Sequence, residues 1–490
     1  MANQSPNRNQ HPLYDVCIVG AGVAGSALAW YLGTRGVKVA IVERDLTEPD
    51  KFIGELLQPG GVMQLQAMGH EEVLEGFDAQ PIQGYALFNG SKSFQIPYPV
   101  VAGTGITGRG FRYGKFVMSL RQKLYDLPNV TVIEGSVNKL VEKPEAGVAS
   151  GIYFVSTTDR EEQLLKAHLT VISDGSLSRF RGELTGGERH IKSYMMGLLL
   201  HDCALPHPNH GHVFMSGTSP FLAYPVSSNE TRVLINFPGE KSPMQGGRAQ
   251  HYFHQAARQL PGYMQNAFKE STEVNHLKAM PAMMVSAKPT MKPGFVVMGD
   301  ALNVRHPLTG GGMTAALTDV RLLGQLLFAV NDFKNPVEMD KALQEFFVRR
   351  NHCNATINIL ADALYEVFSS PDLKDACFNY LNRGGNYVKG PVSILSAVSR
   401  DKQVLLKEFF AVALFGAGNL IKAEPSAQGM VRAHFMMREA LDIITPLLMN
   451  EQPSFAMKGA LNMGQLLFPK PAERPAFREN FTNQSQQFTS

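Results

Sequence analysis

The segment that most constrains this chain is residues 14–45, which read YDVCIVGAGVAGSALAWYLGTRGVKVAIVERD. Two short apolar runs rich in β-branched residues enclose a glycine turn and a helix-forming stretch, the order strand, turn, helix, strand. Gly20, Gly22 and Gly25 have the spacing G-x-G-x-x-G, in which the glycines make a tight turn, admit a pyrophosphate and let the helix pack on the strand. The unit predicts a parallel α/β sheet that binds a dinucleotide.

The same unit indicates how the dinucleotide is held. We expect the pyrophosphate at the N-terminus of the helix that begins near Ala24, where free N–H groups and the helix dipole favour negative charge. Glu43 ends the second strand about 20 residues after the glycines, so its carboxylate is placed to accept from the adenosine ribose. An acid here disfavours a ribose phosphate, and NADP is not the expected occupant.

Composition bounds the function more loosely. The chain has 490 residues, of which 44% are hydrophobic, enough for two or three domains. Lys and Arg exceed Asp and Glu by three (46 against 43), and no basic run interleaves with aromatics, so nucleic acid is a poor partner. The four cysteines lack metal-ligand or disulfide spacing, which predicts no metal site and a reducing compartment. The first residues, MANQSPNRNQHP, lack the apolar stretch of a signal peptide or anchor.

The remaining pattern divides the chain into three regions. After the first unit, alternating apolar and polar residues with glycine and proline turns predict antiparallel strands near residues 82–99 and from about 182 to 288. Strand and helix patterns like those of the first unit return between these segments and again from Phe295, and the pattern is helical from about Val337. We therefore predict a nucleotide-binding domain of residues 13–45, 119–181 and 293–365, a substrate-binding domain of 46–118 and 182–292, and a C-terminal helical region of 366–490.

Three separated glycine-bearing segments favour FAD over NAD. They are the fingerprint, the strand end Ser173-Asp174-Gly175, and Gly299-Asp300 followed by glycines at 310–312. A nicotinamide dehydrogenase needs the first alone, whereas the longer FAD needs a wall for its ribityl and isoalloxazine parts. Asp300 can accept from ribityl hydroxyls, and the helix start at Gly310 and Gly312 is a second anion or flavin-edge site.

Four strings carry a family resemblance: GELLQPGG (54–61), GKFVMSLR (114–121), SDGSLSRFR (173–181) and GDALNVRHPLTGGGMTAAL (299–317). They resemble signature segments of the squalene monooxygenase (squalene epoxidase) family, in the same order, from Tyr14 to about Met449. The resemblance implies an α/β, Rossmann-type FAD-binding domain of the aromatic-hydroxylase-like flavoprotein monooxygenase fold, with an inserted β-rich substrate domain and a C-terminal helical membrane-associating region. The short N-terminus departs from family members that carry an extra hydrophobic region there.

The resemblance also implies an activity. Family members epoxidise squalene to (S)-2,3-oxidosqualene with dioxygen, through a flavin hydroperoxide, in sterol or triterpenoid biosynthesis. They receive NADPH-derived electrons from a separate NADPH-dependent diflavin reductase, and the single dinucleotide fingerprint of this chain predicts the same partner. Because FAD carries the reaction and water destroys its intermediate, we expect a closed apolar pocket and no catalytic triad.

The predicted cofactor-binding residues come from two sources. The residue pattern itself selects Gly20, Gly22, Gly25, Glu43, Asp174, Asp300, Gly310 and Gly312. The resemblance adds, by motif, Val23, Ala24, Arg44, Lys51, Leu56, Arg121, Val137 and Met313. Lys51 departs from the arginine of many relatives, which keeps the charge and loses the planar fork.

No side chain is assigned a catalytic role with confidence from the sequence. Tyr85 matches a family position beside the substrate pocket that orients a glutamine near the flavin, whereas the residues alone favour an ordinary strand tyrosine. His306 is interpreted as a turn residue beside the flavin rather than a base, because oxygen transfer needs no protein base.

Squalene is nearly insoluble in water, so the implied partner is membrane lipid, met by the helices after about Glu366. The longest nearly uncharged run, residues 409–421, is shorter than the roughly 20 residues that span a bilayer. We therefore expect monotopic attachment facing the cytoplasm, at the endoplasmic reticulum in a eukaryote or the plasma membrane in a bacterium. Periodicity alone favours buried core helices equally.

Two alternative functions share these features. An aromatic-ring hydroxylase or isoprenoid reductase has the same fingerprint and distal glycine segments, but needs polar or basic groups for a phenol or a prenyl phosphate, which are scarce in the middle region. A prenyl-binding escort protein without flavin turnover would be colourless when purified. The intact Glu43 and Asp300 favour the enzyme.

Overall fold

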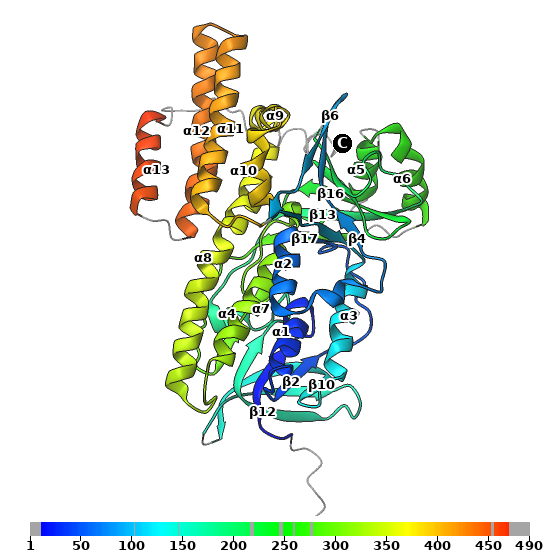
Figure 1. The fold of residues 1–490 in the computed structure, drawn as a ribbon, viewed down its shortest axis with the longest axis vertical. Coiled ribbons are helices and arrows are strands. Elements are labelled where there is room, and N and C mark those ends of the chain that lie inside the picture. Colours follow the sequence, from blue (N-terminus) through cyan, green and yellow to red (C-terminus); the bar gives the residue numbers. More distant parts are fainter. Residues whose placement is uncertain are drawn as a thin grey trace, which may run out of the picture.

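Two sheets and a group of C-terminal helices follow one another along the molecule (Figure 1). The computed structural model describes residues 11–469 except for 102, 146, 216–219, 245–247, 258–259, 275–277 and 452–454. The predicted domain boundaries stay a prediction, and residues 470–490 of the predicted C-terminal region lie outside the described residues.

The first sheet contains the fingerprint unit. Its six strands are β1 (Tyr14–Val19), β2 (Val39–Glu43), β10 (Val130–Glu145), β11 (Val148–Ser156), β12 (Glu162–Ile172) and β18 (Phe295–Val297). Strands β10, β2, β1, β12 and β18 pair in parallel in that order, and β11 runs antiparallel to β10 and β12. The carboxyl ends of the parallel strands share one edge, where open α/β sheets bind ligands.

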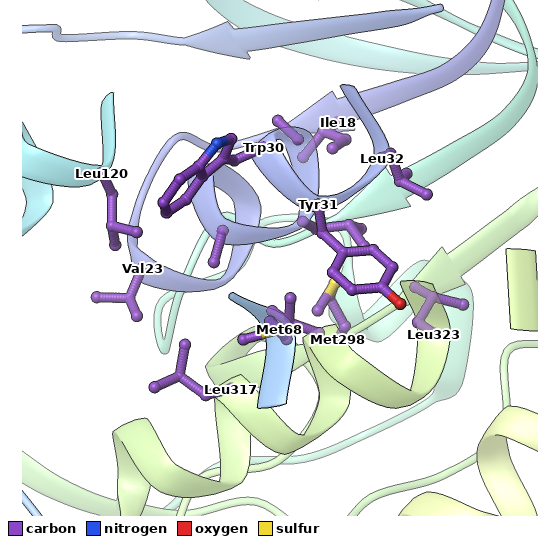
Figure 2. Close-up of a cluster of buried hydrophobic side chains, with 14 of the residues drawn as sticks. Ile18, Val23, Trp30, Tyr31, Leu32, Met68, Leu120, Met298, Leu317 and Leu323 are labelled. Carbon is purple, nitrogen blue, oxygen red and sulfur yellow. The ribbon is translucent and has the colours of Figure 1, made fainter. Parts of the chain in front are cut away.

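Helix α1 (Val23–Gly33) is almost wholly buried, because its sequence is apolar on every side. It packs against α3 (Tyr113–Tyr125) and α7 (Gly312–Phe328). Figure 2 shows Trp30 facing Leu120 of α3 and Tyr31 lying near Leu323 of α7. Trp30, the one tryptophan of the chain, also stacks on His70 with ring centroids 3.5 Å apart. This core fixes the helix whose N-terminus follows the glycine turn.

The second sheet is built from two separated segments. In spatial order its strands are β17 (Lys278–Met284), β13 (His190–His201), β16 (Glu230–Pro238), β15 (Phe221–Pro225), β14 (His210–Phe214), β5 (Gly84–Asn89) and β6 (Lys92–Pro97). A parallel pairing of β5 with β14 joins the early segment to the later one. One face of the sheet packs on α5 (Arg248–Ala257) and α6 (Gly262–Val274), and the other buries Tyr85, Leu87 and Met195 against the C-terminal helices.

Shorter elements complete the part of the chain before α7. They are β3 (Leu56–Leu57), α2 (Pro59–Met68), η1 (Glu71–Leu74), β4 (Gln80–Ile82), β7 (Val100–Val101), β8 (Thr104–Gly105), β9 (Gly108–Gly110), α4 (Arg181–Thr185), η3 (Gly299–Ala301) and η4 (Pro307–Thr309). Strands β3, β9 and β4 form a small sheet. Strand β3 and α2 thereby place the segment around Leu56 beside η4.

The chain after β18 and the two short helical turns is helical. Helix α8 (Pro336–Ser369), 34 residues long, contacts α7 at one end and α9 at the other. The remaining helices are α9 (Pro371–Leu381), α10 (Asn386–Leu395), α11 (Lys402–Ala423), α12 (Ala427–Asn450) and α13 (Phe455–Leu467). Helices α11 and α12 lie side by side as a hairpin that projects from the end of the molecule (Figure 1).

Helix α11 corrects the argument against a membrane span. The helix has 22 residues. It is longer than the uncharged run of residues 409–421 because it continues at both ends through segments that contain charged residues. By length and composition alone it is long and apolar enough to cross a membrane, and 22% of its most apolar stretch is buried. The exclusion of a span on grounds of length was therefore wrong. One such helix is weak support for a span.

Candidate active site

Three glycine turns meet at the carboxyl edge of the first sheet. Gly20 has a φ of +96°, and a Cβ there would lie 2.7 Å from the Ser173 carbonyl oxygen. A Cβ on Gly25 would lie 1.9 Å from the Gly20 carbonyl oxygen, and one on Gly299 would lie 3.1 Å from the Ala24 Cβ. The structure therefore brings together the fingerprint, the end of β12 and the start of η3, three segments far apart in the sequence.

The N-termini of α1 and α7 both fit an anionic group. Neither helix has a side-chain hydrogen bond at its N-cap or an acid in its first turn. A Cβ on Gly22 would lie 3.9 Å from Tyr113 Oη. A Cβ on Gly312 would have no described neighbour within 4 Å. Free N–H groups beside open glycines are what a pyrophosphate or a flavin edge requires. Val23 and Met313, both buried, form the first turns of these helices.

Glu43 and Arg121 brace the fingerprint turn. The Ala21 N–H donates to Glu43 Oε2 at 2.7 Å, and Arg121 Nε donates to the Ala21 carbonyl oxygen at 2.8 Å. Arg121 Nη2 lies 3.7 Å from Glu43 Oε2. Arg44, whose side chain is exposed, follows Glu43 directly, and Val137 is buried in the middle of β10, three residues after the pairing of β10 with β2 ends at Glu134. The predicted adenosine-side residues thus lie on one edge.

Two acids lie at strand ends facing this edge. Asp174 Oδ1 is buried without a partner among the described residues, and Oδ2 accepts from the Arg179 N–H at 3.1 Å. Burial raises the pKa of the Asp174 carboxyl. The Asp300 side chain reaches solvent, although protein atoms surround it. This burial among protein atoms raises the pKa of its carboxyl, and the charge of Arg305 partly opposes the rise. Accessible yet enclosed groups indicate a groove rather than an open surface.

A buried network behind the groove holds Asp300 in place. Asp319 Oδ2 accepts from the Gly299 N–H at 3.1 Å, and Asp319 Oδ1 accepts from Arg350 Nε at 2.9 Å. Arg181 donates to the carbonyl oxygens of Asp300 and Ala301 at 2.8 and 2.7 Å. The sequence analysis missed Asp319 and Arg350. Their signal was available, since an acid and an arginine inside apolar helices are rarely buried unless paired.

Tyr113 is a third residue that the sequence analysis missed. Its Oη faces Gly22, its ring packs against Gly54, and the Lys51 Nζ lies 5.5 Å from its ring centroid. Enclosure by protein, followed by the charge of Asp300, raises the pKa of the Tyr113 hydroxyl, which stays protonated as a donor. Its position directly before GKFVMSLR was the available signal. Lys51 itself has an exposed side chain.

Beyond the groove, Gln58 joins two tyrosines to the turn at Thr309. Gln58 Nε2 donates to Tyr85 Oη at 2.5 Å and to the Thr309 carbonyl oxygen at 2.7 Å, and Tyr98 Oη donates to Gln58 Oε1 at 2.8 Å. A Cβ on Gly310 would lie 3.2 Å from Gln58 Nε2 and 3.5 Å from the Leu56 carbonyl oxygen. Gln58 is therefore locked by its partners against the second glycine segment, and Tyr85 orients it.

His306 is held in one neutral tautomer. Its Nδ1 accepts from the Leu308 N–H at 3.3 Å, so the proton on Nε2 faces Ser193 Oγ at 3.0 Å. The ring stacks on Tyr365 at 4.4 Å, and burial lowers the pKa of His306 to about 3. Both nitrogens are engaged in shaping η4 and linking it to β13. This geometry supports a turn residue and leaves no free nitrogen to act as a base.

Two cavities meet at Tyr85. The smaller, of about 450 Å³, lies between the second sheet, residues 53–56 and the turn from Pro307 to Gly310. The larger, of about 1170 Å³ with part of it open to solvent, lies between the second sheet and α8 to α11. Tyr85, Val213, Leu222 and Leu308 line both. An apolar space thus continues from the glycine turn at 310 into the helical region.

The groups gathered at this edge of the sheet fit a dinucleotide. Within the described residues no group of three or more His, Cys, Asp or Glu side chains could hold a metal ion. The groove instead combines glycine turns, two helix N-termini and strand-end acids, the donor and acceptor set of a long dinucleotide. The apolar cavity at the far end of the groove forms the rest of the site.

Comparison with known proteins identifies the class. A family model of FAD-dependent oxidoreductases matches residues 15–49. The solved structure of Klebsiella pneumoniae HpxO with FAD and uric acid has a TM-score of 0.63 and 18% sequence identity, covering 78% of this chain and 97% of that one. The fold and the site define an FAD-dependent monooxygenase, with FAD as its cofactor.

A second family model, squalene epoxidase, matches residues 166–433, more than half of the chain. Squalene epoxidase 3 of Arabidopsis thaliana is 42% identical over 446 residues, which cover 89% of this chain and 84% of that protein. Squalene epoxidase erg1 of Schizosaccharomyces pombe is 34% identical over 451 residues, covering 90% and 99%. The chain belongs to the squalene epoxidase family, and the resemblance inferred from its motifs is confirmed.

Proposed function

We propose that this enzyme converts squalene to (S)-2,3-oxidosqualene with dioxygen and electrons from NADPH. The observation that carries the proposal is the cavity of about 1170 Å³, which is apolar along nearly all its wall and begins at Tyr85, beside the Gln58 and Gly310 end of the groove. A long hydrocarbon needs such a space, and the relatives that match the chain are named for squalene epoxidation. The alternative of an aromatic hydroxylase requires polar groups in the cavity, which its wall scarcely offers.

The cofactor contacts follow from the groove. We assign the adenosine and pyrophosphate to the turn at Gly20 to Gly25 with Glu43 and Arg121, the ribityl chain to Asp300, and the flavin edge to Gly310 and Met313. FAD, when bound, supplies the activation of dioxygen for transfer to an alkene. The chain itself positions the alkene through Gln58 and Tyr85 and excludes water through the apolar wall.

The direct test is product formation. Purified protein with FAD, NADPH, a diflavin reductase and squalene in detergent should give a lipid one oxygen heavier than squalene, detected by mass spectrometry. Heat-denatured protein in the same mixture is the control. Consumption of NADPH without any such lipid would contradict the proposal.

A separate reductase is part of the proposal. The fingerprint at Gly20 is the dinucleotide motif of the sequence, and Glu43 beside it disfavours the ribose phosphate of NADPH. NADPH alone should leave the bound flavin oxidised under anaerobic conditions, and added diflavin reductase should bleach its absorbance. Rapid bleaching without reductase would show that the chain binds NADPH itself.

We propose monotopic membrane attachment, facing the cytoplasm, through the C-terminal helices. Exposed apolar side chains gather on α11 to α13, including Leu414, Met430, Val431, Leu466 and Leu467. Their helices project from the end of the molecule that carries the large cavity, so a lipid substrate could enter there (Figure 1).

Paired substitutions test this attachment. Leu414→Glu with Val431→Glu should reduce flotation with liposomes of phosphatidylcholine and phosphatidylserine by about 10-fold or more, because charged groups are costly in hydrocarbon. Val348→Glu, at a residue 69% exposed on α8, is the matched control and should float like the wild type. Equal flotation of both variants would overturn the assignment of the surface.

A further inference from the structure

The large cavity has a charged residue in its helical wall. Glu408 of α11 is the one charged side chain among the described residues that line it. Tyr380 of α9 donates from Oη to Glu408 Oε2 at 3.2 Å. Within the described part of the chain, no cation forms an ion pair with Glu408. Glu408 is half-buried, and a carboxylate beside apolar side chains gains by accepting hydrogen bonds, so this position suits a ligand that carries a donor.

The wall is shaped to admit this carboxylate. A Cβ on Gly390 of α10 would lie closer to Glu408 Oε1 than any real contact allows, so the glycine leaves the space that the carboxylate occupies. Pro391, the next residue, lines the same cavity. Burial, with a smaller contribution from Glu408, raises the pKa of Tyr380 to about 12, so its hydroxyl remains protonated. Glu408 therefore offers acceptor oxygens to the cavity, and Tyr380, which does not itself line the cavity, holds the carboxylate by donating to Oε2.

The chemistry of this pair selects among ligands. Two oxygens of a carboxylate accept about four hydrogen bonds, and one donor is recorded here. A ligand hydroxyl can donate to the remaining acceptor positions of Glu408 without bringing a second charge into the apolar wall, as an ammonium group would, whereas a plain hydrocarbon has no donor. The rest of the wall is apolar, so the ligand that carries the hydroxyl must be largely hydrocarbon.

We propose that Glu408, held in place by Tyr380, accepts from a terminal hydroxyl, so that linear terpenoid alcohols bind with the hydroxyl at α11 and an alkene directed toward Tyr85. Epoxidation of the bound alcohol rests on the proposed function. The alkene, dioxygen, NADPH and a proton would give the epoxide, NADP⁺ and water. The alkene π bond is replaced by two C–O bonds to one oxygen atom. NADPH supplies two electrons that reduce the other oxygen atom to water, and the hydroxyl is unchanged.

Binding measurements test the hydroxyl site independently of turnover. The probes are geranylgeraniol and its hydrocarbon analogue with a methyl group in place of the hydroxymethyl group, each tritiated and measured by equilibrium dialysis against FAD-loaded protein at one detergent concentration. The wild type should bind the alcohol about 10-fold more tightly than the hydrocarbon, as expected for a hydrogen bond to a charged group. Glu408→Leu should abolish this preference.

Further variants keep the test decisive. Glu408→Gln preserves the shape, accepts a weaker hydrogen bond and should retain a preference of about 2- to 3-fold, which covers the case in which Glu408→Leu fails to fold. Lys407→Leu, at the neighbouring exposed residue of α11, is the control and should keep the full preference. Equal preference in the wild type and Glu408→Leu, or no preference in the wild type, would overturn the proposal.

Turnover separates this inference from the proposed function. Squalene epoxidation without an alcohol preference would overturn the hydroxyl site alone. An alcohol preference that Glu408→Leu abolishes, in a protein that leaves squalene unchanged, would support the hydroxyl site and contradict the assignment of squalene. With both intact, the wild type should also convert geranylgeraniol to a product one oxygen heavier.

Discussion

The cofactor end of the site is made mainly of backbone, and the hydrocarbon end is made of side chains. At the first, the turn at Gly20 and Gly25 is so tight that a single Cβ would intrude, while Gly22 and Gly312 leave the N-termini of α1 and α7 open. At the second, apolar side chains from one sheet and four helices enclose a cavity of about 1170 Å³. Backbone geometry tolerates almost no substitution, whereas an apolar wall tolerates many if its volume is kept. The two ends should therefore fail in different ways.

The most damaging change should fall at the cofactor end. Gly25→Val places a side chain where a Cβ would already lie 1.9 Å from the Gly20 carbonyl oxygen. We expect FAD affinity to fall by at least about 100-fold, or about 2.7 kcal/mol, measured by titration of flavin fluorescence. Gly182→Ala, at a glycine of α4 with no described atom within 4 Å of the new Cβ, should bind FAD normally. Equal affinities would show that the turn adapts.

The buried ion pair that links the two ends of the site should be the next most sensitive place. Arg232 of the second sheet donates to Glu55, just before β3, at 2.5 and 3.2 Å, and both side chains are buried. Arg232→Met leaves the Glu55 carboxylate buried without its partner, and unfolding in urea should become easier by about 3–5 kcal/mol. Lys278→Met, which breaks an exposed pair with Asp50, should cost about 1 kcal/mol or less. Similar losses in both would mean that burial of the pair is unimportant.

At the boundary between the two ends of the site, Tyr85→Phe should change the yield of epoxide per NADPH without changing FAD binding. The change removes the hydroxyl that accepts from Gln58 Nε2 and keeps the ring in the cavity wall. The loss of one hydrogen bond, about 1 kcal/mol, should lower the epoxide formed per NADPH consumed by about 5-fold and leave FAD affinity unchanged. Tyr194→Phe, at a half-buried tyrosine of β13 whose hydroxyl donates to the Glu240 carbonyl oxygen, serves as the control. A matching fall in FAD affinity would place Tyr85 in the cofactor site instead.

Asp362, on α8 behind the hydrocarbon end, should affect stability in a way that depends on pH. Burial raises the pKa of Asp362 to about 7, against the opposing hydrogen bond from the His306 N–H. An acid with a raised folded-state pKa adds stability below its unfolded pKa and loses it as the pH rises through about 7. Asp362→Asn cannot ionise, so its Tm should rise relative to the wild type between about pH 5 and pH 8. A difference that is constant with pH would contradict this.

The same contrast explains what the sequence could reveal. The fingerprint unit and its neighbours were predictable because the strand, turn and helix of residues 14–45 follow one another and their pattern is local. The parallel pairing of β5 with β14, which closes the second sheet, joins segments more than one hundred residues apart and leaves no local signal. Residue patterns therefore predicted the α/β class better than the assembly of the cavity.

Site residues divide in the same way. Gly20, Glu43 and Asp300 could be selected because each occupies a fixed place relative to a strand end. Gln58 could not, because its partners Tyr85, Tyr98 and Thr309 lie 27, 40 and 251 residues away. A polar side chain gains its place from partners that only the folded chain brings near. The family resemblance supplied Tyr85, and the structure supplies the glutamine that it orients.

The stack of Trp30 on His70 has a practical consequence. Trp30 is the sole indole in the sequence and belongs to the helix to whose N-terminus we assign the pyrophosphate, so the protein has one tryptophan emitter on an element of the proposed flavin site. Oxidised flavin absorbs in the range where indole emits, so energy transfer should quench this emission as the cofactor enters. The emission of Trp30 should therefore report how much flavin is bound, without an added label, in every variant that keeps Trp30.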